Sequence, residues 1–283
     1  MSPPGRPKGE YRSAQHAGCL MSRVAHELRL FFIALQFLSR VPVPRPVGFE
    51  PDWLNQSARY FPAVGTFIGA VAALVLWAAS AVFPPAVAVG LSMASTLVLT
   101  GGFHEDGLAD TGDALGGAVS RERALAIMKD SRIGSYGALT LLIVLGLKAA
   151  TLTAMPPRLA IPALLLAHTA SRAAAVCLIR WLPYAGDIAL AKAKPLARRV
   201  SRAGVAVAIG WVAALCAVLL VLVPAWAPRA ATGLVLLCIG TAWSLRWLRK
   251  RLAGYTGDAL GATQQVTELL VLLGWLAAAQ WPA

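Results

Sequence analysis

Residues 203–228 read AGVAVAIGWVAALCAVLLVLVPAWAP, a stretch without a single formal charge. A membrane-spanning helix needs about 20 predominantly apolar residues, so this stretch is long enough to cross a bilayer. The gaps between charged residues elsewhere in the chain give further stretches of this kind, and together they predict seven spans. The expected spans lie near residues 60–83, 86–102, 133–157, 159–182, 203–228, 230–248 and 269–283. We therefore predict an all-α, polytopic integral membrane bundle of about seven transmembrane helices.

The composition argues against a water-soluble globular protein. Of the 283 residues, 58% are hydrophobic and 14% are charged, and the mean hydropathy is +0.64, which is far from the values of soluble domains. The net charge of +13 indicates an anionic lipid surface or a phosphorylated substrate, because the apolar excess argues against nucleic acid. The four cysteines share no CxxC spacing, so neither a zinc site nor a disulfide framework is expected.

Basic residues favour one orientation in the membrane. If the N-terminal end is cytoplasmic, residues 103–134, 183–202 and 248–263 all return to the same side, and the opposite side keeps only Arg158 and Arg229. Because Lys and Arg concentrate in cytoplasmic loops, this asymmetry selects one topology. We expect a multi-pass protein of the bacterial inner (cytoplasmic) membrane whose active site faces the cytoplasm.

The chain is predicted to form one domain behind a short arm. Residues 1–22 are polar and predict a flexible N-terminal arm, and residues 23–283 predict a single membrane-embedded catalytic domain. Residues 24–41 hold an apolar core that is too short to span, with Arg29 and Arg40 close to its ends. This pattern is typical of an interfacial or re-entrant amphipathic helix. An ordinary helix packed on the bundle is the alternative.

Acidic residues gather at the end of the second predicted span. Asp106, Asp110 and Asp113 are spaced i, i+4 and i+7, which places three carboxylates on one face of a helix. Like charges so placed repel unless a cation lies among them, and hard oxygen ligands suit Mg²⁺ or Mn²⁺. The alternative is a solvated acidic cap on the span. A solvated cap is the weaker explanation, because four of the 13 acidic residues fall between positions 105 and 113.

The sequence TGDALG occurs twice, at residues 111–116 and 256–261. The second copy places Asp258 in a loop that the predicted topology assigns to the same side as the first. A chance echo is the alternative, since no wider repeat supports a duplication. Glu268 follows at the start of the last predicted span, where the helix dipole alone also explains an acidic residue.

Two groups of basic residues suggest phosphate binding. Residues 129–137, KDSRIGSYG, precede the third span and combine basic side chains with backbone donors at a helix start, as in a phosphate cradle. A positive-inside anchor is the alternative. Arg172 falls roughly mid-span, where a charge faces a partner or a polar cavity, and His168 and Ser171 extend it into a polar stripe. Lys148 lies equally deep, but the sequence offers no specific partner for it.

In their order and spacing, these segments resemble the cobalamin synthase family, the adenosylcobinamide-GDP ribazoletransferases, which are integral membrane enzymes of late vitamin B12 assembly. The resemblance covers most of the chain. The matching segments are residues 35–44 (LQFLSRVPVP), 60–69, 101–104 (GGFH), 106–111 (DGLADT) with Asp113, 128–134 (MKDSRIG), 171–172, and 256–262 (TGDALGA) with Glu268.

The resemblance implies a Mg²⁺-dependent transferase, with Mn²⁺ as a substitute, that joins α-ribazole or α-ribazole 5′-phosphate to adenosylcobinamide-GDP and releases GMP. It implies that Asp106, Asp110, Asp113 and Asp258 hold the metal and take part in catalysis, and that His104 or one aspartate accepts the proton of the attacking hydroxyl. The role of Glu105, beside this motif, stays open. The implied substrate-binding residues are Lys129, Asp130, Ser131, Arg132, Gly134, Arg172, Thr256, Gly257 and Glu268.

The implied partners are the corrinoid nucleotide, α-ribazole and membrane lipid, but no nucleic acid. The resemblance also allows a homo-oligomer or an association with other enzymes of late cobalamin assembly.

Three other classes remain as alternatives. A CDP-alcohol phosphotransferase needs Ala-Arg shortly after its Asp-Gly start, where this chain has Asp110 and Thr111. An aromatic prenyltransferase needs two matching aspartate clusters, and residues 256–268 supply the second one poorly. A transporter could use Arg172, His168 and Lys148 as its pathway. A carrier would need ionisable groups near mid-membrane, however, and the carboxylates are predicted at the interface.

Overall fold

The computed structural model describes residues 24–44, 47–48, 50–186 and 197–278. The predicted flexible arm over residues 1–22 lies outside the described residues. So do residues 187–196 of the predicted same-side segment 183–202, which include Lys192 and Lys194, and the end of the last predicted span.

The described part of the chain is built from helices, with one isolated bridge between Tyr184 and Tyr255 and no β-strand. A helix over residues 24–38 comes first. The elements that follow are α2 Pro51–Ser57, η2 Ala58–Tyr60, α3 Phe61–Ser80, α4 Pro85–Thr100, α5 Phe103–Leu115, α6 Arg121–Ile127, α7 Ser135–Thr153, α8 Pro157–Trp181, α10 Arg202–Leu222, η3 Pro224–Trp226, α11 Ala227–Leu252 and α12 Gly257–Ala277. This confirms the predicted all-α fold.

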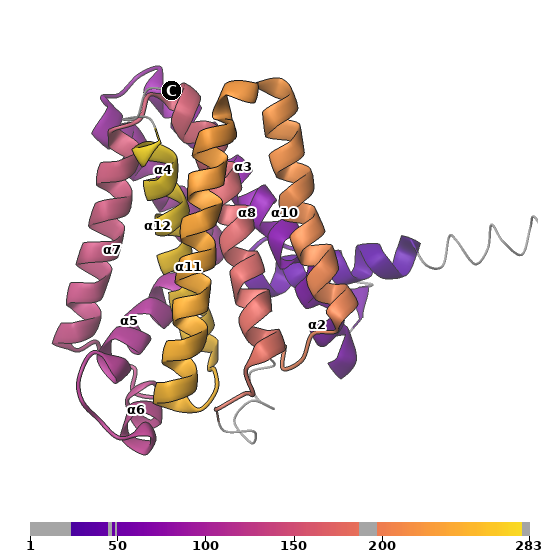
Figure 1. Cartoon of the computed structure of the whole chain (residues 1–283), viewed down its shortest axis with the longest axis vertical. Coiled ribbons are helices and arrows are strands. Elements are labelled where there is room, and N and C mark those ends of the chain that lie inside the picture. The colour runs from indigo at the N-terminus through magenta and orange to yellow at the C-terminus, as the bar shows by residue number, and fades with distance from the viewer. Residues whose placement is uncertain (1–23, 45–46, 49, 187–196, 279–283) are drawn as a thin grey trace, which may run out of the picture.

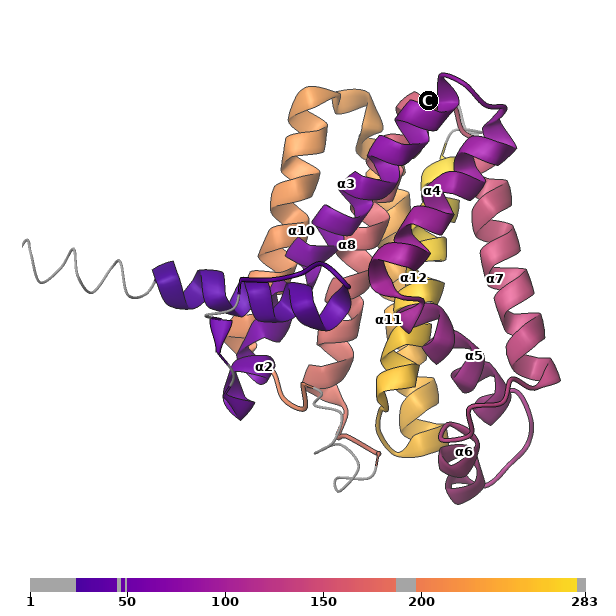
Figure 2. The same ribbon diagram turned by 180° about the vertical axis from the view of Figure 1, so that it is seen from behind.

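Helices α8 and α12 form the centre of the bundle (Figures 1 and 2). Helix α3 packs along α8 at close range, because a Cβ atom at Gly65 would lie only 2.2 Å from the carbonyl oxygen of His168. Helix α12 contacts α5, α7, α8 and α11. On the outside, α7, α10 and α11 expose apolar side chains such as Leu142, Val221 and Ile239, as expected of helices that face lipid.

The number of spans differs from the predicted seven. Five helices are long and apolar enough to cross a membrane, or six if α4 and α5 count as one span, and these two helices meet at an angle of 91°. Helix α12 falls outside this set because Gln264, Gln265 and Glu268 interrupt its apolar sequence. It also begins at Gly257. The predicted start of the last span near residue 269 was therefore wrong, since buried polar partners allow the helix to include these residues.

The three predicted same-side segments meet at one end of the bundle, the lower end in Figure 1. The Arg121 Nε donates to the carbonyl of Leu252 at 2.7 Å, and the Arg251 Nη2 donates to that of Gly117 at 2.8 Å. The backbone N–H of Ala185 donates to a carbonyl of this same region, that of Tyr255, at 2.8 Å. The described parts of these segments thus share one end of the bundle, as the predicted topology requires.

The helix over residues 24–38 runs across the bundle, as Figure 2 shows. Leu30 and Ala34 on this helix are fully buried, whereas Val24 and Leu28 are exposed. Glu27 pairs with Arg59 of η2 at 2.8 Å, which ties the helix to the turn directly before α3. The helix thus packs on the bundle through one buried face, while Val24 and Leu28 on its exposed side are also apolar.

Candidate active site

A sharp bend places the acidic helix α5 at the lower end of the bundle. Gly101 and Gly102 both adopt left-handed backbone conformations, with φ of 73° and 70°, which glycine adopts without the steric cost that other residues meet. The space beside Gly101 is filled by Arg40, whose Nε would lie 2.2 Å from a Cβ at this position. Helix α5 has 13 residues and does not itself span the membrane, because about 20 are needed.

Three carboxylates gather where α5 meets the start of α12. Asp106 is exposed, while Asp110 and Asp258 are half-buried. The two helices touch at Gly107, because a Cβ there would lie 2.8 Å from the carbonyl oxygen of Asp258. Burial, followed by the charges of Asp106, Asp258 and Asp113, raises the pKa of Asp110 to about 7. This region therefore concentrates negative charge.

The carboxylate oxygens at this junction suit a hard cation such as Mg²⁺. In the described ranges of the chain, no three or more His, Cys, Asp or Glu side chains are close enough to hold a metal ion by themselves. Mg²⁺ usually takes one or two carboxylates and completes its shell with water and substrate phosphates. Burial is the main cause of the raised pKa of Asp110, and the charges of Asp106, Asp258 and Asp113 that add to it are charges that a cation would offset. The residues present thus fit a site that is completed by its substrate.

Asp113, the fourth acidic residue of this group, caps helix α7. Its Oδ2 accepts the backbone N–H of Gly134 at 2.7 Å, and its Oδ1 accepts that of Gly137 at 2.8 Å. Acidic side chains bound to helix N-terminal amides stabilise that helix. The structure thus gives Asp113 a structural task, although its charge also acts on Asp110 together with the charges of Asp106 and Asp258.

The segment before α7 is exposed and internally paired. Arg132 forms an ion pair with Asp130 at 2.6 Å, and this bonding lowers the pKa of Asp130 to about 2. Lys129, Ser131 and Gly134 are also exposed. The predicted phosphate cradle would share the α7 amides with Asp113, since this carboxylate already accepts the N–H groups of Gly134 and Gly137.

The second TGDALG copy is the beginning of a helix and was wrongly predicted as a loop. Thr256 is the N-cap of α12, and its hydroxyl accepts the backbone N–H of Ala259 at 3.2 Å. Gly257 is the first residue of the helix. Asp258 follows directly, so the cap fixes where its carboxylate emerges next to α5. The first copy, residues 111–116, covers the end of α5 instead.

A separate cluster of charged residues lies inside the bundle around Glu268, which is fully buried. Glu268 forms an ion pair with Lys148 of α7. Its Oε2 lies 2.9 Å from His168 Nδ1 and 3.9 Å from Arg172 Nη1, both on α8. The side chain of Arg172 also donates to the carbonyl of His168 at 2.9 Å. Glu268 is therefore a mid-helix counter-ion, and the prediction that it starts the last span was wrong.

Two glutamines connect this cluster to α5, and sequence reasoning missed both. Gln265 Nε2 donates to Glu105 Oε1 at 2.9 Å, and its Oε1 accepts from Lys148 Nζ at 3.3 Å. Gln264 donates to Glu268 one turn away. Burial raises the pKa of Glu105, and the Lys148 charge opposes that rise. The available signal was the run of polar residues at helical spacing from Gln264 to Glu268.

His104 lies on the inner side of α5, where it is 4% exposed. A Cβ at Gly261 of α12 would lie 3.2 Å from the His104 carbonyl oxygen, so the two helices leave little space there. The structure places His104 among buried groups and apart from the exposed Asp106.

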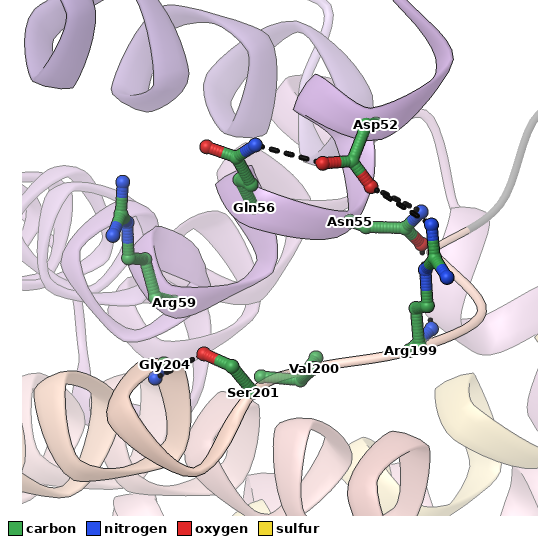
Figure 3. A pocket seen from close by; sticks show the side chains of 8 residues that line it. All are labelled: Asp52, Asn55, Gln56, Arg59, Arg199, Val200, Ser201 and Gly204. Atoms are coloured by element: carbon green, nitrogen blue, oxygen red, sulfur yellow. Dashed lines mark hydrogen bonds and ion pairs between the residues drawn. The ribbon is translucent and has the colours of Figure 1, made fainter.

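A cavity lies between α2 and the start of α10, and Figure 3 shows its lining. It measures about 340 Å³. Asp52 accepts from Gln56 at 2.8 Å and pairs with Arg199 at 3.3 Å, while Arg59 pairs with Glu27. This lining holds a single acidic residue, Asp52. Carboxylates gather at the α5 and α12 junction instead, so we place the candidate site there.

The fold and the gathered carboxylates define an integral membrane protein of the polytopic helical class with an acidic site at one end of its bundle. The chain belongs to the cobalamin-5-phosphate synthase family, whose profile matches residues 30–276. As a member of this family, the protein is an enzyme, a transferase of cobalamin biosynthesis. No solved structure matches it.

Relatives named adenosylcobinamide-GDP ribazoletransferase match nearly the whole chain. The protein from Leptothrix cholodnii is 58% identical over 266 residues, which cover 91% of this chain and 98% of the relative. The protein from Shewanella amazonensis is 44% identical, covering 89% of this chain and 96% of the relative. The protein from Vibrio parahaemolyticus is 41% identical, covering 89% and 93%.

Proposed function

We propose that this enzyme transfers α-ribazole, or α-ribazole 5′-phosphate, to adenosylcobinamide-GDP and releases GMP. The observation that carries the proposal is the 58% identity to a ribazoletransferase over almost the full length of both chains. The carboxylates at the α5 and α12 junction support it, because chemistry on a diphosphate depends on neutralising and positioning phosphate charge.

We propose that Asp106, Asp110 and Asp258 supply the one or two carboxylates that Mg²⁺ needs, with water and substrate phosphates completing its shell, and that Mn²⁺ would serve in its place. The bound cation would act as a Lewis acid that stabilises negative charge on the diphosphate. Lys129 and Arg132, exposed before α7, would attract the phosphates from the same end of the bundle. We leave Asp113 out of the ligand set, since both of its oxygens accept α7 amides.

The transfer forms one P–O bond and breaks another. A ribose hydroxyl of α-ribazole attacks the phosphorus that stays on the corrinoid, and the bond from this phosphorus to the GMP oxygen breaks. The hydroxyl proton must pass to a base within hydrogen-bonding reach. Among the candidates, we favour a junction carboxylate over His104, because His104 is only 4% exposed.

Arg172 and Glu268 are proposed to hold the bundle together and not to touch substrate. The Arg172 side chain is 2% exposed and Glu268 is fully buried. Their charges already face each other and Lys148. A phosphate ligand would instead need a guanidinium open to the interface.

The proposal is tested with membranes that contain the full chain. Release of GMP from adenosylcobinamide-GDP should require both α-ribazole and Mg²⁺, and it should stop when EDTA is added. Membranes carrying the Asp106→Asn variant serve as the matched control. GMP release without α-ribazole would indicate a hydrolase, and no release under any condition would contradict the proposed function.

The cytoplasmic orientation is tested in the same system. We expect inside-out vesicles to use added adenosylcobinamide-GDP, since the basic connectors and the acidic junction share one end of the bundle. Sealed right-side-out vesicles should not use it. Activity in right-side-out vesicles alone would reverse the topology.

A further inference from the structure

Glu105 is next to the proposed metal ligands, yet it points into the bundle. Gln265 donates to its Oε1 at 2.9 Å. Its Oε2 is buried and has no hydrogen-bond partner within the described residues. Consecutive helix positions differ by about 100° around the axis, so a helix that turns Glu105 inward turns Asp106 outward. The burial of the two side chains agrees, since Glu105 is half-buried and Asp106 is exposed.

The charges of the buried cluster do not balance without Glu105. Lys148 and Arg172 supply two cations, and they are 3% and 2% exposed. Glu268 supplies one anion, while His168 lies against it through Nδ1. An uncompensated buried charge is strongly destabilising. Glu105, which reaches Lys148 through Gln265, is the anion that closes the balance.

We propose that Glu105 is a positioning residue: it is the second anion of the buried cluster, and this anchor fixes the rotation of α5 that turns Asp106 and Asp110 towards Asp258. The consequence for metal binding rests on the proposed function. Small residues set only the distance between α5 and α12, through Gly107 and Gly261. The hydrogen bond from Gln265 to Glu105 has a defined direction, and it fixes which face of α5 is turned towards α12.

The charge balance makes a specific rescue possible. Glu105→Gln keeps the size of the side chain and an oxygen that can accept from Gln265, but it leaves two buried cations against one anion. Adding Lys148→Gln leaves one of each, Arg172 and Glu268. A purely structural hydrogen bond from Gln265 would predict no such rescue, because the second substitution removes a further polar contact.

The test measures Mn²⁺ binding by electron paramagnetic resonance on the purified full chain in detergent, together with thermal unfolding. We expect Glu105→Gln to weaken Mn²⁺ binding about tenfold, as the loss of residues that orient metal ligands commonly does. The double variant with Lys148→Gln should recover most of the affinity and melt at a higher temperature than Glu105→Gln. The exposed Glu50, whose side chain caps no helix amide, provides the control Glu50→Gln, which should match the parent.

Two results would overturn the positioning role. One is parental Mn²⁺ affinity in Glu105→Gln, and the other is a double variant no better than the single one. If Glu105→Gln does not fold, the double variant must fold and bind Mn²⁺, and its failure would also overturn the proposal. A parent that binds no Mn²⁺ would instead contradict the metal site of the proposed function. The melting temperatures of the two variants would then still decide the charge pairing.

Discussion

Replacing Glu268 by Gln separates a structural role of this residue from a role in substrate binding. The change removes the one anion that Lys148, His168 and Arg172 share and keeps the size of the side chain. Removing one partner of a buried ion pair costs about 3–5 kcal/mol. That is a large part of the roughly 5–15 kcal/mol that stabilises a typical domain.

At roughly 2–4 °C per kcal/mol for a chain of this order of size, a loss of about 3–5 kcal/mol should lower the melting temperature by about 6–20 °C. The assay is thermal unfolding in detergent, followed by tryptophan fluorescence. The control is Glu122→Gln, which changes an exposed glutamate in α6. The compensated variant Glu268→Gln with Lys148→Gln should regain part of the loss, because Arg172 then faces Glu105 alone.

One result would contradict the structural role of Glu268. If Glu268→Gln melts within about 2 °C of the parent, which is less than 1 kcal/mol, and only turnover is lost, Glu268 contacts the substrate, as the family resemblance implies. The buried cluster would then not support the fold in the way its contacts suggest.

Four further outcomes are expected. Asp110→Asn should abolish turnover yet raise the melting temperature of the EDTA-treated protein at pH 8. The raised pKa means that its charge opposes folding, so the gain should shrink as the pH falls from about 7 towards 3.8; a lower melting temperature at pH 8 would contradict this. Asp113→Asn should lower the stability of the protein by about 1 kcal/mol through the weakened α7 cap, while Mn²⁺ still binds. Loss of Mn²⁺ binding without loss of stability would show that Asp113 is a metal ligand. Gly107→Ala should reduce turnover at least tenfold, because its Cβ would lie 2.8 Å from the Asp258 carbonyl; parental turnover would show that the two helices can separate freely. Cysteines placed at Ser120 and Lys250 in a cysteine-free chain should both resist an impermeant thiol reagent on intact cells. Labelling of one alone would contradict the placement of both residues at the same end of the bundle.

The local features of the fold could be predicted from the sequence. The i, i+4 and i+7 spacing of Asp106, Asp110 and Asp113 places all three in one helix, as predicted. The depth of Arg172 within its span was also predicted correctly, since α8 covers residues on both sides of it. These features depend on helix periodicity and charge spacing, which a single sequence displays.

Long-range partners could not be predicted in this way. The partner of Lys148 in α7 is Glu268 in α12. Helices α8, α10 and α11 lie between these two along the chain, and no local pattern links the two positions. The start of α12 was missed for the same reason. Hydropathy counts Gln264, Gln265 and Glu268 as polar, whereas in the bundle each of them is buried against a polar group of its own or another helix.

The buried cluster also bears on the transport alternative. On sequence alone, a carrier was judged less suitable because carboxylates were expected only at the interface. Glu268 contradicts that expectation, since it lies fully buried between α7 and α8 together with Lys148 and Arg172. Charge at membrane depth is nevertheless not a pathway, because a pathway must be hydrated and must release its ion or substrate. Here each charged head faces another at less than 4 Å and is at most 3% exposed. The buried charges are thus paired with one another inside the bundle, which argues against a carrier pathway through them.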